Sequence, residues 1–191
     1  MRLRASTVIA MAAAFVLGGA VGAVALLPTA SLPLGQPAPT GKPVWTEVAW
    51  PFLADEWGKG KAFWCKAAHC GTEVHLYIRA KIGFCNCTTG VADDDELERL
   101  SDFPLMGEGI ANLGDGRPIA VAWMKGRSRS YAVDKPNRSG KSALSIAFND
   151  RCDAIVATVV LDGEPARIEP AALEFVNSKT VLRWAEVTLG L

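Results

Sequence analysis

Four of the five cysteines and both histidines of this 191-residue chain lie within residues 64–87, WCKAAHCGTEVHLYIRAKIGFCNC. Thiolates and imidazoles bind zinc or copper, and paired thiols form disulfides or exchange them. The segment therefore leaves three chemistries open: a metal site, a redox pair or structural disulfides. The side chains concerned are Cys65, His69, Cys70, His75, Cys85 and Cys87.

The geometry of an extended strand argues against one metal site built from all six side chains. Apolar and polar residues alternate from Thr72 to Phe84, a pattern typical of a strand with one face on the core. A strand rises about 3.3 Å per residue, so His75 and Cys85 would lie roughly 33 Å apart. We therefore expect no metal at this cluster. A smaller site with Cys85, Cys87 and a distant residue remains the alternative.

Structural disulfides are the interpretation that we favour. Cys65 and Cys70 flank the expected tip of a hairpin, where Cα atoms across the strands are about 5.5 Å apart and suit a bridge. Cys152 opens a later hairpin and is expected to reach Cys85 or Cys87. Such a bridge would close a loop of more than sixty residues, worth about 4 kcal/mol in the chain-entropy model. A pairing of Cys70 with Cys85 or Cys87 also remains open, and the odd number leaves one thiol free.

The motif Cys85-Asn86-Cys87 supports the alternative function, a thiol-redox or transition-metal-handling protein. A bridge between Cys85 and Cys87 would be strained, and strained disulfides exchange readily. Arg79 and Lys81 precede the motif, and a nearby cation lowers the pKa of a thiol. The usual C-x-x-C before a helix is absent. The pair is therefore the runner-up to structural bridging.

The N-terminus predicts export. Arg2 and Arg4 precede the apolar run Val8–Leu27, which at twenty residues is about long enough to cross a bilayer. We expect residues 1–27 to be a cleaved signal peptide or an uncleaved signal anchor. The expected location is therefore extracytoplasmic and periplasm-like, with the protein either anchored in the inner membrane or secreted after cleavage.

The rest of the chain divides into a linker and one domain. Residues 28–43 contain five prolines, a composition typical of an extended spacer. Residues 44–191 are then a single extracytoplasmic domain, long enough to bury a core. Export takes this domain to a compartment where cysteines tend to oxidise.

Charge and motifs exclude several function classes. Twenty basic and twenty acidic residues cancel, which argues against nucleic acid as a partner. The stretch SGKSA at 139–143 lacks the first glycine of a phosphate-binding loop, because Lys135 stands there, so we expect no nucleotide and no cofactor. The spacing of His69 and His75 assembles no catalytic triad. A binding or envelope-associated module is therefore favoured over an enzyme.

Hydrophobic patterns predict an α+β fold, mainly antiparallel sheet built from hairpins. The strand at 72–84 pairs with 60–66 through the connection 67–72. Its water-facing side chains include Arg79 and Lys81, and its apolar set is Val74, Leu76, Ile78, Ala80, Ile82 and Phe84. A second hairpin is expected from 118–125 and 129–133 around a turn at 126–128, and a third from 143–148 and 154–161. The last strand is apolar on both faces, which places it in the middle of the sheet.

Helices are expected in three places besides the N-terminal transmembrane or signal helix. Asp93 and Glu96 predict the N-terminal cap of a short acidic helix. Pro170 suits the first position of a helix over 170–176. Ser178 as a cap and Gly190 as a stop bound the last one.

Two groups of residues predict binding surfaces, and each has a plainer interpretation. Six basic residues suit an anionic lipid or another acidic partner, or are a solvated loop balanced by the acidic helix; they are Lys125, Arg127, Arg129, Lys135, Arg138 and Lys141. Four tryptophans suit a platform for glycan or peptide, or belong to the core; they are Trp45, Trp50, Trp57 and Trp64. The expected partners are thus a protein, a glycan or an anionic lipid, and the membrane itself if the N-terminal helix is uncleaved.

Overall fold

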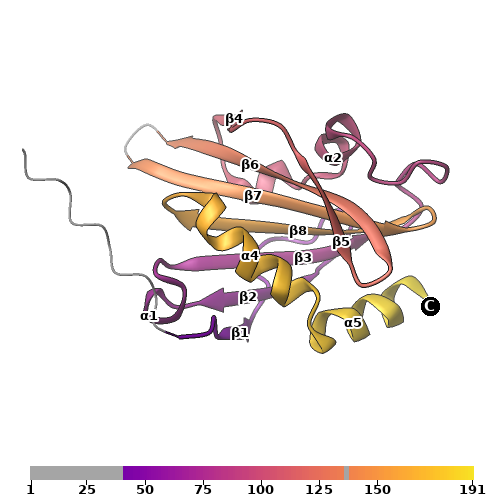
Figure 1. Ribbon diagram of the computed structural model, residues 1–191, viewed down its shortest axis with the longest axis horizontal. Helices are drawn as coiled ribbons and strands as arrows, with labels where there is room; N and C mark the ends of the chain where they lie inside the picture. The colour runs from indigo at the N-terminus through magenta and orange to yellow at the C-terminus, as the bar shows by residue number, and fades with distance from the viewer. Residues whose placement is uncertain (1–40, 136–137) are drawn as a thin grey trace, which may run out of the picture. The chain divides into compact units, whose positions relative to one another are not determined.

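The computed structural model describes residues 41–135 and 138–191, and these form an α+β fold dominated by one antiparallel sheet (Figure 1). The strands are β1 (Trp45–Val48), β2 (Lys61–Cys65), β3 (Val74–Lys81), β4 (Ile110–Asn112), β5 (Arg117–Val121), β6 (Met124–Lys135), β7 (Arg138–Asp150) and β8 (Asp153–Asp162). The helices are α1 (Ala67–Cys70), α2 (Asp94–Leu100), α3 (Phe103–Met106), α4 (Pro165–Val176) and α5 (Lys179–Leu189).

The sheet follows the order β1-β2-β3-β8-β7-β6-β4, and β5 also pairs with β6. Two of the predicted hairpins are confirmed, since β2 pairs with β3 and β7 pairs with β8. Strand β8 lies between β3 and β7, and residues 154–159 within it are buried. Its central position, predicted from an apolar run on both faces, is confirmed.

The second hairpin is correct in its strands and wrong in its turn. β5 and β6 turn at Ala122 and Trp123, and residues 126–128 lie inside β6. Ala122 takes a positive φ of 51°, which closes the turn. Gly126 is needed in the strand because a side chain there would collide with the backbone of β7 at Ala147 and Phe148. The glycine thus marks a close approach of two strands rather than a turn.

Strand β3 departs from its predicted alternation at its C-terminal half. Arg79 and Lys81, expected to face water, are only 4 % exposed. The strand ends at Lys81, and Ile82, expected in the core, is 55 % exposed. The expected continuation to Phe84 is broken by a turn at Gly83, which has a φ of +68°.

The two faces of the sheet are covered by different segments. On one face, Leu76, Ile146 and Val159 belong to the main core, to which α4 and α5 contribute Ile168, Ala172, Val176, Val181 and Ala185. Figure 1 shows α4 running across the sheet. On the other face, Ala147 and Val156 pack against Leu97 and Leu100 of α2. Since β-strand side chains alternate between faces, Arg79 and Lys81 belong to this second face.

Of the three helices predicted within the described residues, two have the caps that the sequence predicts. The side chain of Asp93 accepts a hydrogen bond from the backbone N–H of Glu96 and caps α2, and Ser178 caps α5, which ends at Gly190. Helix α4 starts at Pro165, not at Pro170, which lies inside it. Pro165 takes the first-turn position that the sequence predicts for Pro170, so the helix is more than one turn longer than predicted.

The N-terminal predictions concern residues that are not described. The expected transmembrane or signal helix, and the linker up to residue 40, lie outside the described residues. Within 41–135 and 138–191, the helices are all too short or too polar to cross a bilayer.

Candidate functional site: the cysteine loop and the aromatic strip

The cysteines form two disulfides at opposite ends of β3. Cys65 is bonded to Cys70 across α1, five residues along the chain, and Cys87 is bonded to Cys152, 65 residues away. Cys85 is left as a buried free thiol. The structure thus contains the hairpin-tip bridge, chooses Cys87 as the partner of Cys152, and does not pair Cys85 with Cys87.

The surroundings of Cys85 keep its thiol protonated. Its Sγ donates a hydrogen bond to the carbonyl of Arg151 at 3.1 Å. Burial first, and then the carboxylates of Glu96 and Asp153, together raise the pKa of the Cys85 thiol to about 11. The prediction that Arg79 and Lys81 would lower the pKa of a thiol here is wrong, because both cations bind Asp102 instead.

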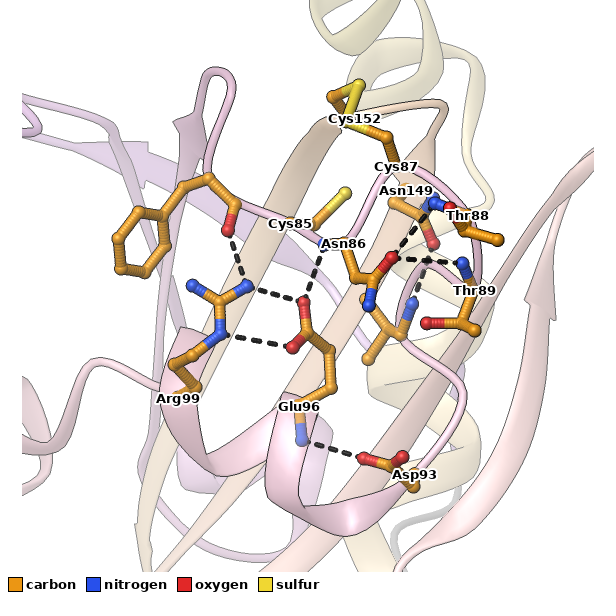
Figure 2. A network of polar contacts seen from close by, with 12 residues as sticks. Cys85, Asn86, Cys87, Thr88, Thr89, Asp93, Glu96, Arg99, Asn149 and Cys152 are labelled. Carbon is orange, nitrogen blue, oxygen red and sulfur yellow. Dashed lines mark hydrogen bonds and ion pairs between the residues drawn. A yellow bond between two sulfur atoms is a disulfide. The ribbon is translucent and has the colours of Figure 1, made fainter.

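The loop around Cys85 and Cys87 is fixed by polar contacts that come from its own residues and from α2 (Figure 2). The side-chain oxygen of Asn86 accepts from the backbone N–H groups of Thr88 and Thr89. Glu96 accepts from the backbone N–H of Asn86 at 2.8 Å, and Arg99 joins Glu96 to the carbonyl of Phe84. With the Cys87–Cys152 bridge, these contacts give the loop a structural role.

The remaining candidate metal ligands do not converge. The side chain of His75 forms a hydrogen bond with Glu73 at 3.0 Å, and His69 lies in α1. Cys85 follows the turn after β3, so the expectation that it shares one strand with His75 is wrong. Over the described ranges, no three side chains of His, Cys, Asp or Glu come together in an arrangement that could hold a metal ion.

The basic residues do not form one free cationic surface. Arg127 pairs with Asp94 at 2.6 Å, and Arg129 pairs with Glu98 at 2.7 Å, so α2 neutralises both. Lys125 is exposed, whereas Lys141 lies beside Glu73 and His75. The side chains of the other two, Lys135 and Arg138, lie outside the described part of the structure.

The four tryptophans are divided among three places. Trp45 stacks on Phe175 of α4, with ring centroids 4.9 Å apart, and packs against the main core. Trp57 meets Phe84 edge to face at 4.6 Å. Trp50 and Trp64 lie on the opposite face of the sheet, where other aromatic rings join them. These two tryptophans form the start and the end of one continuous row.

We call this row the aromatic strip, and it consists of Trp50, Phe52, Trp64, His75 and Tyr77. Trp64 and His75 are cross-strand partners on β2 and β3, with centroids 6.5 Å apart and planes within 10°. His75 and Tyr77 are 6.3 Å apart with planes within 12°. Phe52 and Trp50 meet Tyr77 edge to face at 4.8 and 6.0 Å. All five residues are half-buried, so the strip is partly open to solvent.

Charged residues border the strip beside Trp64 and His75. The ammonium of Lys66 lies 5.3 Å from the ring centroid of Trp64. Beside His75, a hollow of about 40 Å³ is bordered by Glu73, Lys141 and Asp162. The strip thus combines apolar ring surface with acceptors and donors of hydrogen bonds at its rim.

A buried ionic cluster holds one end of the strip in place. Arg79 donates to Asp102 through Nε and Nη2, and through Nη1 to Asp55. The guanidinium of Arg79 also lies 6.0 Å from the ring centroid of Trp50. The segment from Trp50 to Asp55 is therefore attached to β3 by charge as well as by ring contacts.

No relative was found for this chain. Family models, curated proteins and solved structures all give no match. The function must therefore be inferred from the site itself.

A second polar pocket lies between α4 and β6, and it is already satisfied. The carboxylate of Glu169, only 3 % exposed, accepts a hydrogen bond from Ser128 at 2.5 Å and pairs with Arg117. These residues border a pocket of about 260 Å³. Because both carboxylate oxygens have partners, the pocket gives no sign of a missing ligand.

Sequence reasoning named two members of the strip and missed three. Trp50 and Trp64 were among the candidate platform residues. The sequence singles out His75 only as a possible metal ligand or triad member, and Tyr77 only as a polar position of an alternating strand. Two ring residues at i and i+2 on such a face are nevertheless a usable signal. Phe52 lies in an irregular segment, where no periodicity locates it.

Proposed function

We propose that this protein is an exported, disulfide-stapled binding module that holds its ligand on the aromatic strip. The observation that carries the proposal is the continuous row of five half-buried rings on one sheet face, bordered by charged side chains. Exposed aromatic surface with a polar rim is typical of binding sites, because rings contribute large contact area at small entropic cost.

The disulfides support the location. Disulfides form and persist mainly in oxidising compartments outside the cytoplasm, and the two bridges are consistent with such a location. The apolar N-terminal run supports the same interpretation. We therefore place the module on the extracytoplasmic side, secreted or held at the membrane by residues 1–27.

The redox alternative has less support. An exchanging thiol must be deprotonated and accessible. Cys85 is buried, with a thiol pKa of about 11, and Cys87, its partner in the redox alternative, forms a disulfide with Cys152. The fixed loop in Figure 2 suits a staple better than a reactive pair.

Site-specific photo-crosslinking in the producing cells tests the proposal without assuming a ligand class. A photo-crosslinking amino acid in place of Lys66 samples the rim of the strip, and the same residue in place of Trp123 samples another surface. Trp123 is 53 % exposed at the β5–β6 turn and provides a matched control. We expect an adduct from position 66 that disappears with Trp64→Ala, and none from position 123. No adduct at position 66, or equal adducts at both positions, would contradict the proposal.

A further inference from the structure

We infer that the ligand of the aromatic strip is a neutral glycan chain. The inference rests on the proposed function and adds the chemical class of the ligand. It follows from the shape of the ring surface, from the polar groups at its rim, and from the absence of the contacts that a peptide would need.

The row of rings suits a chain of pyranose sugars, each of which has an apolar face of C–H groups. Trp64, His75 and Tyr77 lie in sequence across β2 and β3 with planes within 10° and 12° of one another. Aromatic faces carry negative partial charge. The C–H groups on one face of a pyranose carry positive partial charge, so sugars stack on such rings. The three residues are half-buried, so the exposed parts of their rings form a row along which successive sugars of a chain could pack.

The rim supplies what sugar hydroxyls require. Each hydroxyl both donates and accepts hydrogen bonds. Next to the rings, Lys66 and Lys141 are donors, Glu73 and Asp162 are acceptors, and His75 can be either. Two cations and two anions balance, so the rim favours a neutral ligand over a strongly anionic one.

The geometry disfavours an extended peptide. A peptide strand binds by pairing with a free sheet edge. The strip instead lies on the face of β2 and β3, and each of these strands is already paired on both sides.

The indole N–H groups also count against a peptide. The Nε1 atoms of Trp50 and Trp64 are covered and have no hydrogen-bond partner within residues 41–135 and 138–191. They therefore cannot donate to the carbonyls of a proline-rich segment lying on the rings. These two side chains can therefore contact a ligand only through the apolar surface of their rings, and a sugar can pack on such a surface.

Direct binding to three probes tests the inference, with the full chain purified with both disulfides intact. The probes are cellohexaose, N-acetylchitohexaose and decaproline, and binding is measured by tryptophan fluorescence and calorimetry. We expect at least one hexasaccharide to bind with a dissociation constant of about 1 mM or tighter, and decaproline not to bind. Trp64→Ala should weaken the sugar affinity about tenfold or more, and Trp123→Ala should leave it unchanged.

His75→Ala keeps the test decisive if Trp64→Ala fails to fold. The His75 side chain is 39 % exposed and pairs only with Glu73 among the residues described, so its removal leaves the core intact and should still weaken sugar binding. The inference is overturned if neither hexasaccharide binds, or if the sugar affinity is the same in Trp64→Ala and His75→Ala as in the native protein. It is also overturned if decaproline binds and Trp64→Ala abolishes that binding. In each case, a Trp64-dependent crosslink in cells would still support the binding module, so the two failures are distinguishable.

Discussion

Asp102 binds Arg79 through both carboxylate oxygens, at 2.6 and 2.8 Å, and both side chains are at most 5 % exposed. Lys81 reaches the same carboxylate at 2.9 Å. The three residues join β3 to the segment between α2 and α3, 23 residues away from Arg79 in sequence. This ionic contact explains why the polar side of β3 is buried.

Asp102→Asn should be among the most destabilising single substitutions in the protein. It leaves Arg79 and Lys81 buried with a lost counter-charge, which typically costs about 3–5 kcal/mol. Urea unfolding followed by circular dichroism measures the free energy of unfolding. Asp55→Asn is the matched control, because its side chain is 40 % exposed and also binds Arg79. We expect the control to cost less than about 1 kcal/mol. Equal costs for the two variants would show that burial does not govern the cluster.

Glu96 should make the stability depend on pH in the acid range. The hydrogen bond from Arg99 holds the pKa of the Glu96 carboxyl below its ordinary value of 4.5. The unfolded chain then binds more protons, so this stabilisation is complete above pH 4.5 and is lost as the pH falls through the folded pKa. Unfolding free energies should therefore fall less steeply in Glu96→Gln than in the native protein below pH 4.5.

Asp95→Asn is the control for that experiment, since it removes an exposed carboxylate from the same turn of α2. We expect its acid profile to follow the native one more closely. If Glu96→Gln and the native protein lose stability in parallel, the Arg99 contact does not supply the expected linkage.

The thiol of Cys85 should be unreactive in the folded protein. With a thiol pKa of about 11, only about one molecule in a thousand carries the thiolate at pH 8. A thiol reagent such as Ellman's should therefore react slowly with the native protein, and with one thiol after unfolding without reductant. Cys85→Ala should show no thiol in either state. Rapid stoichiometric reaction of the native protein, or more than one thiol after unfolding, would favour the redox alternative.

The sheet and the helix ends were largely predictable, because hydrophobic periodicity and helix caps depend on residues close together in the sequence. Val74, Leu76 and Ile78 fix the core face of β3, and the apolar run of β8 fixes its central place. The burial of Arg79 was not predictable, because its partners Asp55 and Asp102 come from distant segments. The alternation of apolar and polar residues along a strand shows which side chains are polar. It does not show whether a residue distant in the sequence supplies a counter-charge that allows them to be buried.

The candidate site, too, was predictable where it depends on local spacing and not where it depends on tertiary packing. Bridging at the hairpin tip followed from local spacing, whereas the choice of Cys87 over Cys85 depends on how the loop of Figure 2 docks on α2. Trp45 and Trp64 could not be assigned to opposite faces until the register of β1 and β2 was known. Composition identified aromatic residues, and only tertiary packing sorted core from surface.

Radical labelling of tryptophan is the most direct test of the central claim, that the aromatic strip is the ligand-binding surface. Hydroxyl-radical oxidation of each tryptophan is compared by mass spectrometry between intact producing cells and the purified protein. We predict that Trp64 is protected in cells relative to the purified protein, while Trp123 is oxidised equally in both. Equal oxidation of Trp64 in the two samples would contradict the account.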